Sequence, residues 1–327
     1  MKNLIKTLLF VGILSVFGCS KVVYPVPPVL DGYGAKQDTA DKFAIQPART
    51  VNDINGKLVL NSEACDSAVI NEPLPGGFAH NDYCHPHPLN DALENGFTNV
   101  EADIFLVNGK LIIAHVFPYF KSERTLESLY LKPLLEKITQ NKGKVLTGYN
   151  NPITLLIDIK TKARPTYRAL KPVLEKYRSI LSTYENGKMT YRAVTIVLSG
   201  HKPYSLIKKE KNRIAFIDED LSKLRYNQVN GNMLAMASCN YSDIMDWDGT
   251  GSISNEERNA LCAYVLLAHN MGLKVRLWAS PEKEVVWDEL LSCGVDLINT
   301  DQLVALKNYF STHAIEKNQA IKNTSDN

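Results

Sequence analysis

Eight short apolar runs, separated by segments with helical periodicity, are the feature that most restricts how this chain can fold. The runs are predicted strands, and they cover residues 77–80, 99–107, 153–160, 193–199, 213–218, 232–238, 274–280 and 295–300. Residues 110–115 form a companion to the second run and are predicted to be the returning arm of a hairpin. Buried strands that alternate with helices favour a parallel sheet covered by helices. A count of eight favours a closed (β/α)8 TIM-type barrel in a single α/β domain.

The segments between the runs support this prediction. Residues 166–181 carry an apolar stripe, and Pro172 within it predicts a kink or a later helix start. Ser254 and Glu257 have the spacing of a capping box at the start of a helix over 254–271. The Gly-rich dinucleotide fingerprint is absent after the first strand, which weakens the alternative of an open sheet.

The predicted domain organisation places the barrel at residues 76–310, close to the usual size of about 250 residues. The other parts are a signal peptide at 1–18, a tether and N-terminal extension at 19–75, and a polar tail at 311–327. The formal net charge of +2 comes without a clustered basic surface, so we expect no nucleic-acid partner. We expect a monomer.

The N-terminus combines a basic start with an apolar run from Leu8 to Phe17, too short for a membrane span of about 20 residues. Gly18 and Cys19 follow, and the segment resembles the lipobox of bacterial lipoproteins. That resemblance implies lipid on Cys19 and a membrane anchor at the bacterial cell envelope, facing the periplasm or the cell exterior. A plain signal peptide with a chance cysteine is the alternative.

The chain has six cysteines, and five remain if Cys19 carries lipid. Cys65 with Cys84 is one candidate disulfide. Cys262 and Cys293 lie in apolar patterns, so we expect them to be buried small hydrophobic residues.

In a barrel, reactive side chains come from the C-terminal ends of the strands. Glu101 and Asp103 lie two residues apart on the second strand and therefore point the same way. Two carboxylates in an apolar run need compensation, and one divalent cation, Mg²⁺ or Ca²⁺, suits oxygen ligands. Asp158 on the third strand is the natural third ligand, with Lys160 on the same face. A salt-bridged pair at a strand end is the alternative.

His80 ends the first strand and His115 ends the hairpin arm, so they flank the acidic pair. Two such histidines suggest a general acid and a general base, and with a cation they form the set that phosphodiester cleavage needs. We assign His80 to the attacking group and His115 to the leaving oxygen, with the reverse assignment open.

Several segments carry a family resemblance: GFAHNDY, PLNDALENGFTNVEADIFLVNGKLIIAH, TLESLYLKPL, LLIDIKT and GLKVRLWASPEKEVVWDELLSCGVDLINTDQL. Together they resemble the phospholipase-C-like phosphodiesterase superfamily, which includes glycerophosphodiester phosphodiesterases, phosphatidylinositol-specific phospholipases C and sphingomyelinase D toxins. The most similar branch is the altered-inheritance-of-mitochondria type, and the resemblance covers about residues 76–305. It implies catalytic roles for His80 and His115, metal binding by Glu101, Asp103 and Asp158, and a phosphate contact for Lys160. Trp278 matches an aromatic residue that borders the site.

The sequence departs from the glycerophosphodiesterases in two places. Asn81-Asp82-Tyr83 follows His80 where Arg-Gly is usual, and Asp158 stands where Glu is typical. These departures leave the substrate open. The predicted substrate contacts are Lys160, Asn81, His85, Arg276, Trp278 and Asn299.

The sequence therefore predicts a metal-dependent phosphodiesterase acting on a small-molecule or lipid phosphodiester of the glycerophosphodiester or phospholipid-headgroup type. A non-catalytic lipoprotein that binds a phosphorylated ligand at the barrel mouth is the alternative. A glycosidase is disfavoured because Glu101 and Asp103 are too close for opposed roles across a sugar ring. Residues 246–257 nearly match a calcium-binding EF-hand loop, but we expect a barrel loop that enters a capped helix.

Overall fold

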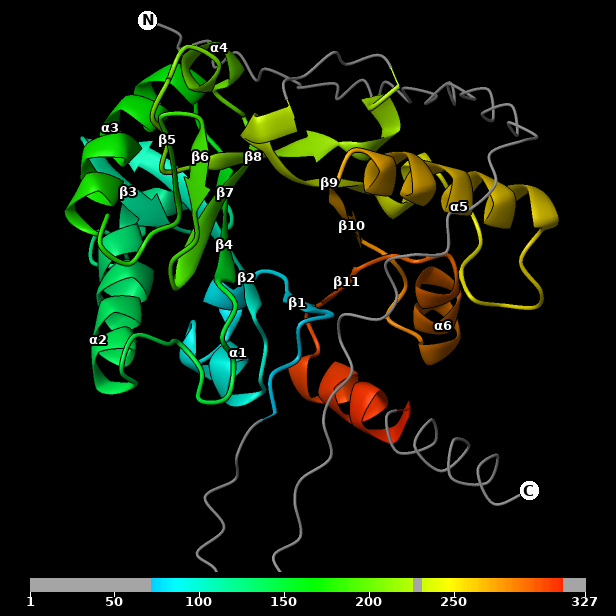
Figure 1. Cartoon of the computed structure of the whole chain (residues 1–327). Coiled ribbons are helices and arrows are strands. Elements are labelled where there is room, and N and C mark those ends of the chain that lie inside the picture. The colour runs from blue at the N-terminus through cyan, green and yellow to red at the C-terminus, as the bar shows by residue number, and fades with distance from the viewer. Residues whose placement is uncertain (1–71, 226–230, 314–327) are drawn as a thin grey trace, which may run out of the picture.

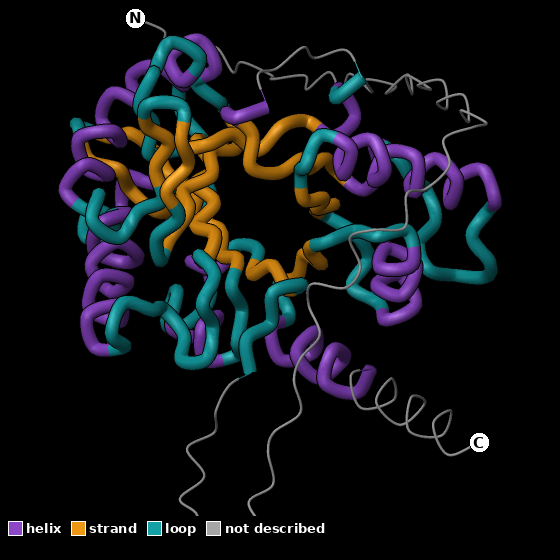
Figure 2. Tube along the Cα trace, viewed as in Figure 1, coloured by secondary structure: helices purple, strands orange, loops and turns teal. Residues whose placement is uncertain are grey.

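Eight parallel strands form a closed ring, which Figure 2 shows end-on. The computed structural model describes residues 72–225 and 231–313. The ring strands are β1 (Gly77–Ala79), β2 (Asn99–Val107), β4 (Ile153–Ile159), β7 (Val194–Gly200), β8 (Phe216–Asp220), β9 (Leu234–Asn240), β10 (Lys274–Trp278) and β11 (Leu297–Thr300). The short strand β1 closes the ring because it pairs with β11 on one side and with β2 on the other. The predicted TIM-type barrel is confirmed.

Helices cover the outside of this ring (Figure 1). They are α1 (Asn90–Glu94), α2 (Lys132–Gln140), α3 (Ala163–Lys176), α4 (Tyr204–Ile207), α5 (Asn255–Asn270) and α6 (Glu284–Ser292). A further helix covers residues 303–313, across the predicted start of the polar tail at 311. Ser254 caps α5 by accepting a hydrogen bond from the backbone N–H of Glu257, which confirms the capping box.

Helix α3 departs from the prediction because it begins at Ala163 and continues past Pro172 to Lys176. A proline inside a helix leaves the carbonyl four residues earlier, here that of Arg168, without its donor. Both Pro172 and Arg168 are exposed, so water can satisfy that carbonyl. The helix therefore tolerates the proline.

A hairpin extends β2 beyond the ring. Strand β3 (Lys110–Ile113) runs antiparallel to β2, with Val107 opposite Lys110 and Ile104 opposite Ile113. The turn consists of Asn108 and Gly109, both with positive φ, as a tight two-residue hairpin requires. Because β3 runs back toward the barrel, the chain after Ile113 returns to the level of the residues that precede Ile104 on β2.

The ring interior has an apolar layer below a polar one. The apolar layer contains Phe78, Leu156, Val197, Met236 and Leu297, all buried. Since side chains of a strand alternate, the next inward residues lie two positions further along each strand. The list of these residues is Asp158, Ser199, Ser238 and Asn299, together with His80, which follows β1. The apolar layer thus supports a polar mouth at the C-terminal ends of the strands.

A disulfide joins Cys262 of α5 to Cys293, directly after α6, with a Cα–Cα distance of 4.7 Å. The expectation that these two cysteines are separate buried hydrophobic residues is therefore wrong. Two helices distant in sequence lie side by side, and an apolar pattern does not reveal such proximity. Cys84 is a free exposed cysteine and Cys239 a free buried one.

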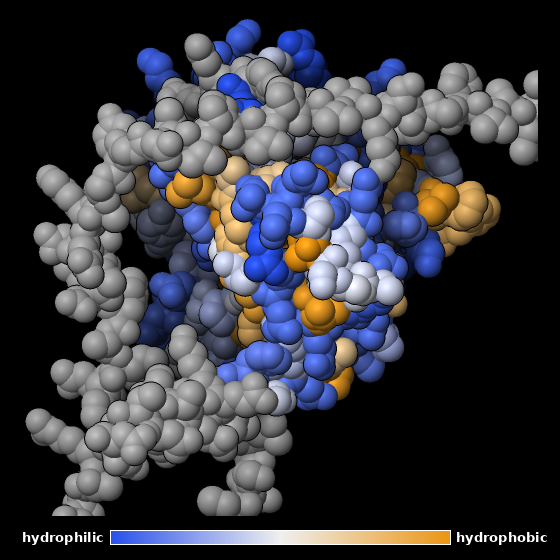
Figure 3. Space-filling view, turned by 90° about the vertical axis from the view of Figure 1, so that its right-hand side faces the viewer, coloured by the Kyte–Doolittle hydropathy of each residue, from blue (hydrophilic) through white to orange (hydrophobic). Residues whose placement is uncertain are grey.

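The predicted signal peptide, Cys19, Cys65 and the extension as far as residue 71 lie outside the described residues, as does the tail from residue 314. Within the described parts of the chain, no helix is long and apolar enough to cross a membrane. The face on the side of α5 and α6 is mostly hydrophilic, with small separate apolar patches (Figure 3).

Candidate active site at the barrel mouth

The three predicted metal ligands come together at the mouth. Glu101, Asp103 and Asp158 each offer a carboxylate oxygen, and these oxygens lie within 4.8 Å of one another. Asp103 on β2 stands directly opposite Asp158 on β4 in the parallel pairing, and Glu101 lies one step lower on the same face. Glu101 and Asp103 are buried, whereas Asp158 is half-buried.

Lys160 places a positive charge beside this cluster. Its Nζ lies 3.0 Å from Oδ2 of Asp103 and 2.9 Å from Oδ2 of Asp158. The other oxygen of each carboxylate, Oδ1, is buried without a hydrogen-bond partner. Burial and the charge of Glu101 raise the pKa of Asp103 to about 6. Three carboxylates grouped this closely, two of them with a buried unpartnered oxygen, fit a divalent cation, which would stabilise their charged form.

Gly200, at the end of β7, allows Asp158 to take its position. Its φ of +65° lies in the left-handed region, and a Cβ there would stand 1.9 Å from Oδ1 of Asp158. The neighbours Ser199 and His201 do not form a nucleophile and base pair. Ser199 donates to Asp218, and the ring of His201 lies 3.0 Å from the carbonyl of Ile159.

His80 lies beside the buried end of this cluster. Its Nε2 is 3.7 Å from Oε2 of Glu101, and its Nδ1 is 2.9 Å from Oδ1 of Asp301. Burial lowers the pKa of His80, but the hydrogen bond to Asp301 and the charge of Glu101 outweigh it, so the pKa is raised. Asp301 was not among the predicted site residues, although it follows the last barrel strand.

The hydroxyl of Tyr83 contacts three residues of the site. Its hydroxyl lies 2.6 Å from Oδ2 of Asp103, 2.6 Å from Oδ1 of Asn81 and 3.0 Å from Nδ1 of His115. Burial and the charge of Asp103 raise the pKa of this phenol, so it stays protonated and donates. Sequence reasoning missed Tyr83, because only its place in the GFAHNDY segment pointed to it.

His115 lies next to a different carboxylate from His80. Its Nδ1 is 3.8 Å from Oδ2 of Asp103, and its side chain is 61% exposed. It reaches this position because β3 descends toward the ring, and not because it ends a barrel strand. The two predicted catalytic histidines therefore contact different carboxylates of one cluster, His80 touching Glu101 and His115 touching Asp103.

Arg276 and Asn299, two predicted substrate contacts, are buried beside the carboxylates. Nη1 of Arg276 donates to Oδ1 of Asn299 at 3.1 Å and lies 3.5 Å from Oε2 of Glu101. Its Nη2 lies 3.8 Å from Oδ2 of Asp218. In this position Arg276 places a buried positive charge between Glu101 and Asp218.

Asp218 of β8 is a second carboxylate in the polar layer that sequence reasoning missed. It accepts hydrogen bonds from Ser199 and Ser238, and burial raises its pKa despite the opposing charge of Arg276. Its neighbours Ser199 and Ser238 come from the adjoining strands β7 and β9, and Arg276 comes from β10, one strand further along the sheet.

The remaining predicted contacts surround the mouth more loosely. Asn81 donates to Asp301 at 3.3 Å, beside His80. Trp278 is partly exposed at the end of β10. His85 borders a hollow of about 610 Å³ that also includes Asp91 and Gln302.

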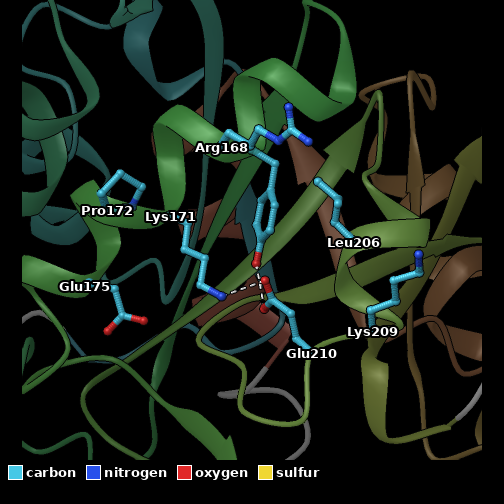
Figure 4. Close-up of a pocket in the computed structure, with 8 residues that line it drawn as sticks. Arg168, Lys171, Pro172, Glu175, Leu206, Lys209 and Glu210 are labelled. Atoms are coloured by element: carbon cyan, nitrogen blue, oxygen red, sulfur yellow. Dashed lines mark hydrogen bonds and ion pairs between the residues drawn. The ribbon is translucent and has the colours of Figure 1, made fainter.

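Two other features lie apart from this chemistry. A hollow of about 540 Å³ between α3 and α4, shown in Figure 4, contains Lys171, paired with Glu210 at 2.7 Å, and none of the predicted site residues.

In the EF-hand-like segment, Glu257 accepts hydrogen bonds from the backbone N–H groups of Asp246 and Trp247. This confirms the expected barrel loop. Among the described residues, Glu101, Asp103 and Asp158 are the one acidic group placed to hold a metal ion.

Comparison with known proteins identifies relatives of this chain. Residues 72–218 match the AIM6-like phosphodiesterase domain. The chain is also 29% identical over 267 residues to Altered inheritance of mitochondria protein 6 of Eremothecium gossypii, covering 71% of this chain and 68% of that protein. The Lachancea thermotolerans protein of the same name is 29% identical over 275 residues, covering 70% and 64% respectively. No solved structure matches the chain.

The comparison supports the resemblance to the altered-inheritance-of-mitochondria branch and corrects one prediction. A Saccharomyces cerevisiae protein of the same name is 28% identical over 280 residues, covering 71% of this chain and 69% of that protein. All three of these relatives are fungal. The predicted location at a bacterial cell envelope is therefore wrong. A short basic and apolar N-terminus has a similar composition in several kinds of leader, so it does not identify the organism.

Proposed function

We propose that this chain is a metal-dependent phosphodiesterase. The observation that best supports the proposal is the placement of two histidines next to a group of three carboxylates, two of which have buried oxygens without a partner. The substrate class that we propose is a glycerophosphodiester or a phospholipid headgroup.

Glu101, Asp103 and Asp158 would hold the cation, Mg²⁺ or Ca²⁺. When bound, it supplies positive charge that offsets the charge of the phosphate and stabilises the more highly charged transition state. Lys160 adds a second positive charge at the same edge, since its Nζ lies within 3.0 Å of both Asp103 and Asp158. Arg276 offsets the charge of Glu101, since its Nη1 lies 3.5 Å from Oε2 of that carboxylate.

The surroundings of the two histidines suggest their roles. Asp301 holds Nδ1 of His80, so Nε2 faces the carboxylate cluster, as a base that activates the attacking hydroxyl or water would need. Tyr83 contacts Nδ1 of His115, which makes Nε2 the nitrogen available to protonate the leaving oxygen. The raised pKa of the Tyr83 phenol keeps it a donor to this network.

The function is tested by hydrolysis of bis-nitrophenyl phosphate and of a panel of glycerophosphodiesters and phospholipids, with products followed by phosphorus NMR. We expect turnover with Mg²⁺ or Ca²⁺ that is lost in Asp158→Asn and in excess chelator. Absence of turnover on the whole panel with both cations would overturn the proposal.

The assignment of the histidines is tested with leaving groups of different basicity. His115→Ala should lose about 10²-fold or more in kcat on an alkyl diester, but much less on a nitrophenyl diester, whose leaving group needs no protonation. His80→Ala should lose activity on both substrates. The opposite pattern would exchange the two roles.

A further inference from the structure

Four large apolar side chains stand exposed directly after His115. Val116, Phe117, Tyr119 and Phe120 are 57%, 70%, 75% and 90% exposed, while Pro118 between them is buried. We call residues 116–120 the aromatic loop. Such exposure requires these side chains to project from the surface, beside the candidate site.

The base of the aromatic loop is held firmly. The N–H of Ile113 donates to the carbonyl of Arg124 at 2.7 Å, so the chain leaves and rejoins the barrel at one place. The guanidinium of Arg124 donates to the backbone carbonyl of Tyr83 at 2.6 Å. A turn over Pro118–Phe120 closes the tip, with Lys121 N–H donating to the carbonyl of Pro118. The loop is therefore fastened to Tyr83, whose hydroxyl contacts both Asp103 and His115.

This run differs from the other exposed apolar residues in the described part of the chain, which stand singly along the sequence. Single exposed apolar residues are ordinary in soluble proteins, and Leu266 and Val304 are examples. The face on the side of α5 and α6 shows only small separate patches (Figure 3). A contiguous group of three aromatic side chains and a valine indicates a surface that contacts an apolar partner.

We propose that the aromatic loop inserts into a lipid surface and that the phosphodiester cleaved at the adjacent site is a phospholipid headgroup. This inference rests on the proposed phosphodiesterase function. A protruding apolar tip can be buried in a protein partner only if that partner has a matching groove. A bilayer is deformable and can surround the tip without one. Tyr and Phe favour the boundary between headgroups and acyl chains. The exposed Lys121 and the neighbouring Arg124 add positive charge where headgroup phosphates would lie.

The position of the loop gives the insertion a consequence for the reaction. Val116 follows His115 without a gap, so a tip buried among acyl chains would hold His115 near the level of the headgroups. A phosphodiester of the bilayer would then meet His115 and Lys160 while its acyl chains remain in the lipid. A soluble diester would gain nothing from the loop.

Vesicle binding tests this proposal without depending on catalysis. Full-length protein is sedimented with sucrose-loaded vesicles of phosphatidylcholine, and of phosphatidylcholine with phosphatidylglycerol. We expect binding to both kinds of vesicle, and at least about tenfold weaker binding for the double variant Phe117→Ser, Phe120→Ser, because two large apolar side chains no longer enter the lipid. Leu266→Ser with Val304→Ser is the matched control, since it removes two exposed apolar residues elsewhere and should bind as the unaltered protein does.

A folding control and a depth probe complete the experiment. The thermal unfolding midpoint of the double variant should equal that of the unaltered protein, because both phenylalanines are exposed. In Tyr119→Trp, brominated acyl chains should quench fluorescence beyond the quenching in a parent that keeps Tyr119. Absence of vesicle binding, or equal binding by the two double variants, would overturn the inference. Hydrolysis of bis-nitrophenyl phosphate by the unaltered protein is scored separately, so failure of the phosphodiesterase function is distinguishable.

Discussion

A single hydrogen atom, the side chain of Gly200, determines where Asp158 can point. Any Cβ at this position meets Oδ1 of Asp158 at 1.9 Å, and the left-handed backbone is unfavourable for other residues. The third proposed metal ligand therefore depends on a residue of the neighbouring strand that carries no functional group.

We predict that Gly200→Ala lowers the free energy of unfolding by roughly 1–3 kcal/mol and weakens cation binding. Gly109→Ala is the matched control, because Gly109 also has positive φ but nothing within 4 Å of its Cβ position. Urea unfolding and calorimetric titration with Mg²⁺ and Ca²⁺ measure the two effects. Cation binding that falls equally in both variants would contradict the role given to Gly200.

Asp82 is a buried carboxyl outside the cluster of Glu101, Asp103 and Asp158, and it should make the stability of the fold depend on pH. It accepts from the N–H of Leu89 and the hydroxyl of Tyr130, yet its Oδ1 has no partner, and burial raises its pKa from 3.8 to about 6. A raised folded-state pKa means that the neutral carboxyl is favoured in the fold. Its contribution to stability is fully present below about pH 4 and is lost as the pH rises through 6.

We therefore predict that the unaltered protein loses about 3 kcal/mol of unfolding free energy between pH 4 and pH 7 through Asp82. Asp82→Asn stays neutral and should not show this loss. Urea unfolding of both proteins across this range measures it. The difference between their unfolding free energies should shift in favour of the variant as the pH rises. Parallel curves would show that Asp82 does not titrate in this way.

At the scale of the elements, apolar runs predicted the barrel strands well because each run is buried on both faces. Two strands are displaced toward the C-terminus: β8, predicted at 213–218, is found at Phe216–Asp220, and β9, predicted at 232–238, is found at Leu234–Asn240. Arg213 pairs instead with Tyr184 of β5, a strand in the hairpin of β5 (Thr183–Glu185) and β6 (Lys188–Thr190) that was not predicted. The Asn186-Gly187 turn is the signal that could have revealed this hairpin.

The site was predictable where it depends on alternation along one strand, as for Glu101 and Asp103. It was not predictable where it depends on ring closure or on a loop. Asp301 reaches His80 only because β1 and β11 are neighbours, although the residues are far apart in sequence. Tyr83 reaches Asp103 only through the turn that follows β1.

The disulfide between α5 and α6 joins residues 31 positions apart. Closing a loop of that length restricts the unfolded chain, which typically stabilises the fold by about 2–4 kcal/mol. We predict a loss of this size for Cys262→Ala with Cys293→Ala, measured by urea unfolding under non-reducing conditions. Because neither residue touches the mouth, cation affinity should not change. A strong loss of affinity would contradict the separation of the two regions.

At the scale of the whole molecule, the carboxylate cluster should couple cation binding to folding. A ligand that binds only the folded state stabilises it by RT ln(1 + [L]/Kd), which is about 2.7 kcal/mol at a hundredfold excess over Kd. We predict that the thermal unfolding midpoint rises with Mg²⁺ or Ca²⁺ and falls in chelator. Asp103→Asn should abolish the response. An equal response in this variant would place the cation elsewhere.

The β2–β3 hairpin and the aromatic loop follow one another along the chain, so residues 101–120 contain two proposed metal ligands, one proposed catalytic histidine and the exposed apolar tip. Under the proposals above, the reaction and the preferred surroundings of the substrate are inherited together. Recombination that exchanges whole strand and helix units among related barrels would transfer both at once. A change in surface preference alone has to arise by point substitution at the tip, so we expect relatives that act on soluble substrates to differ there while keeping the hairpin.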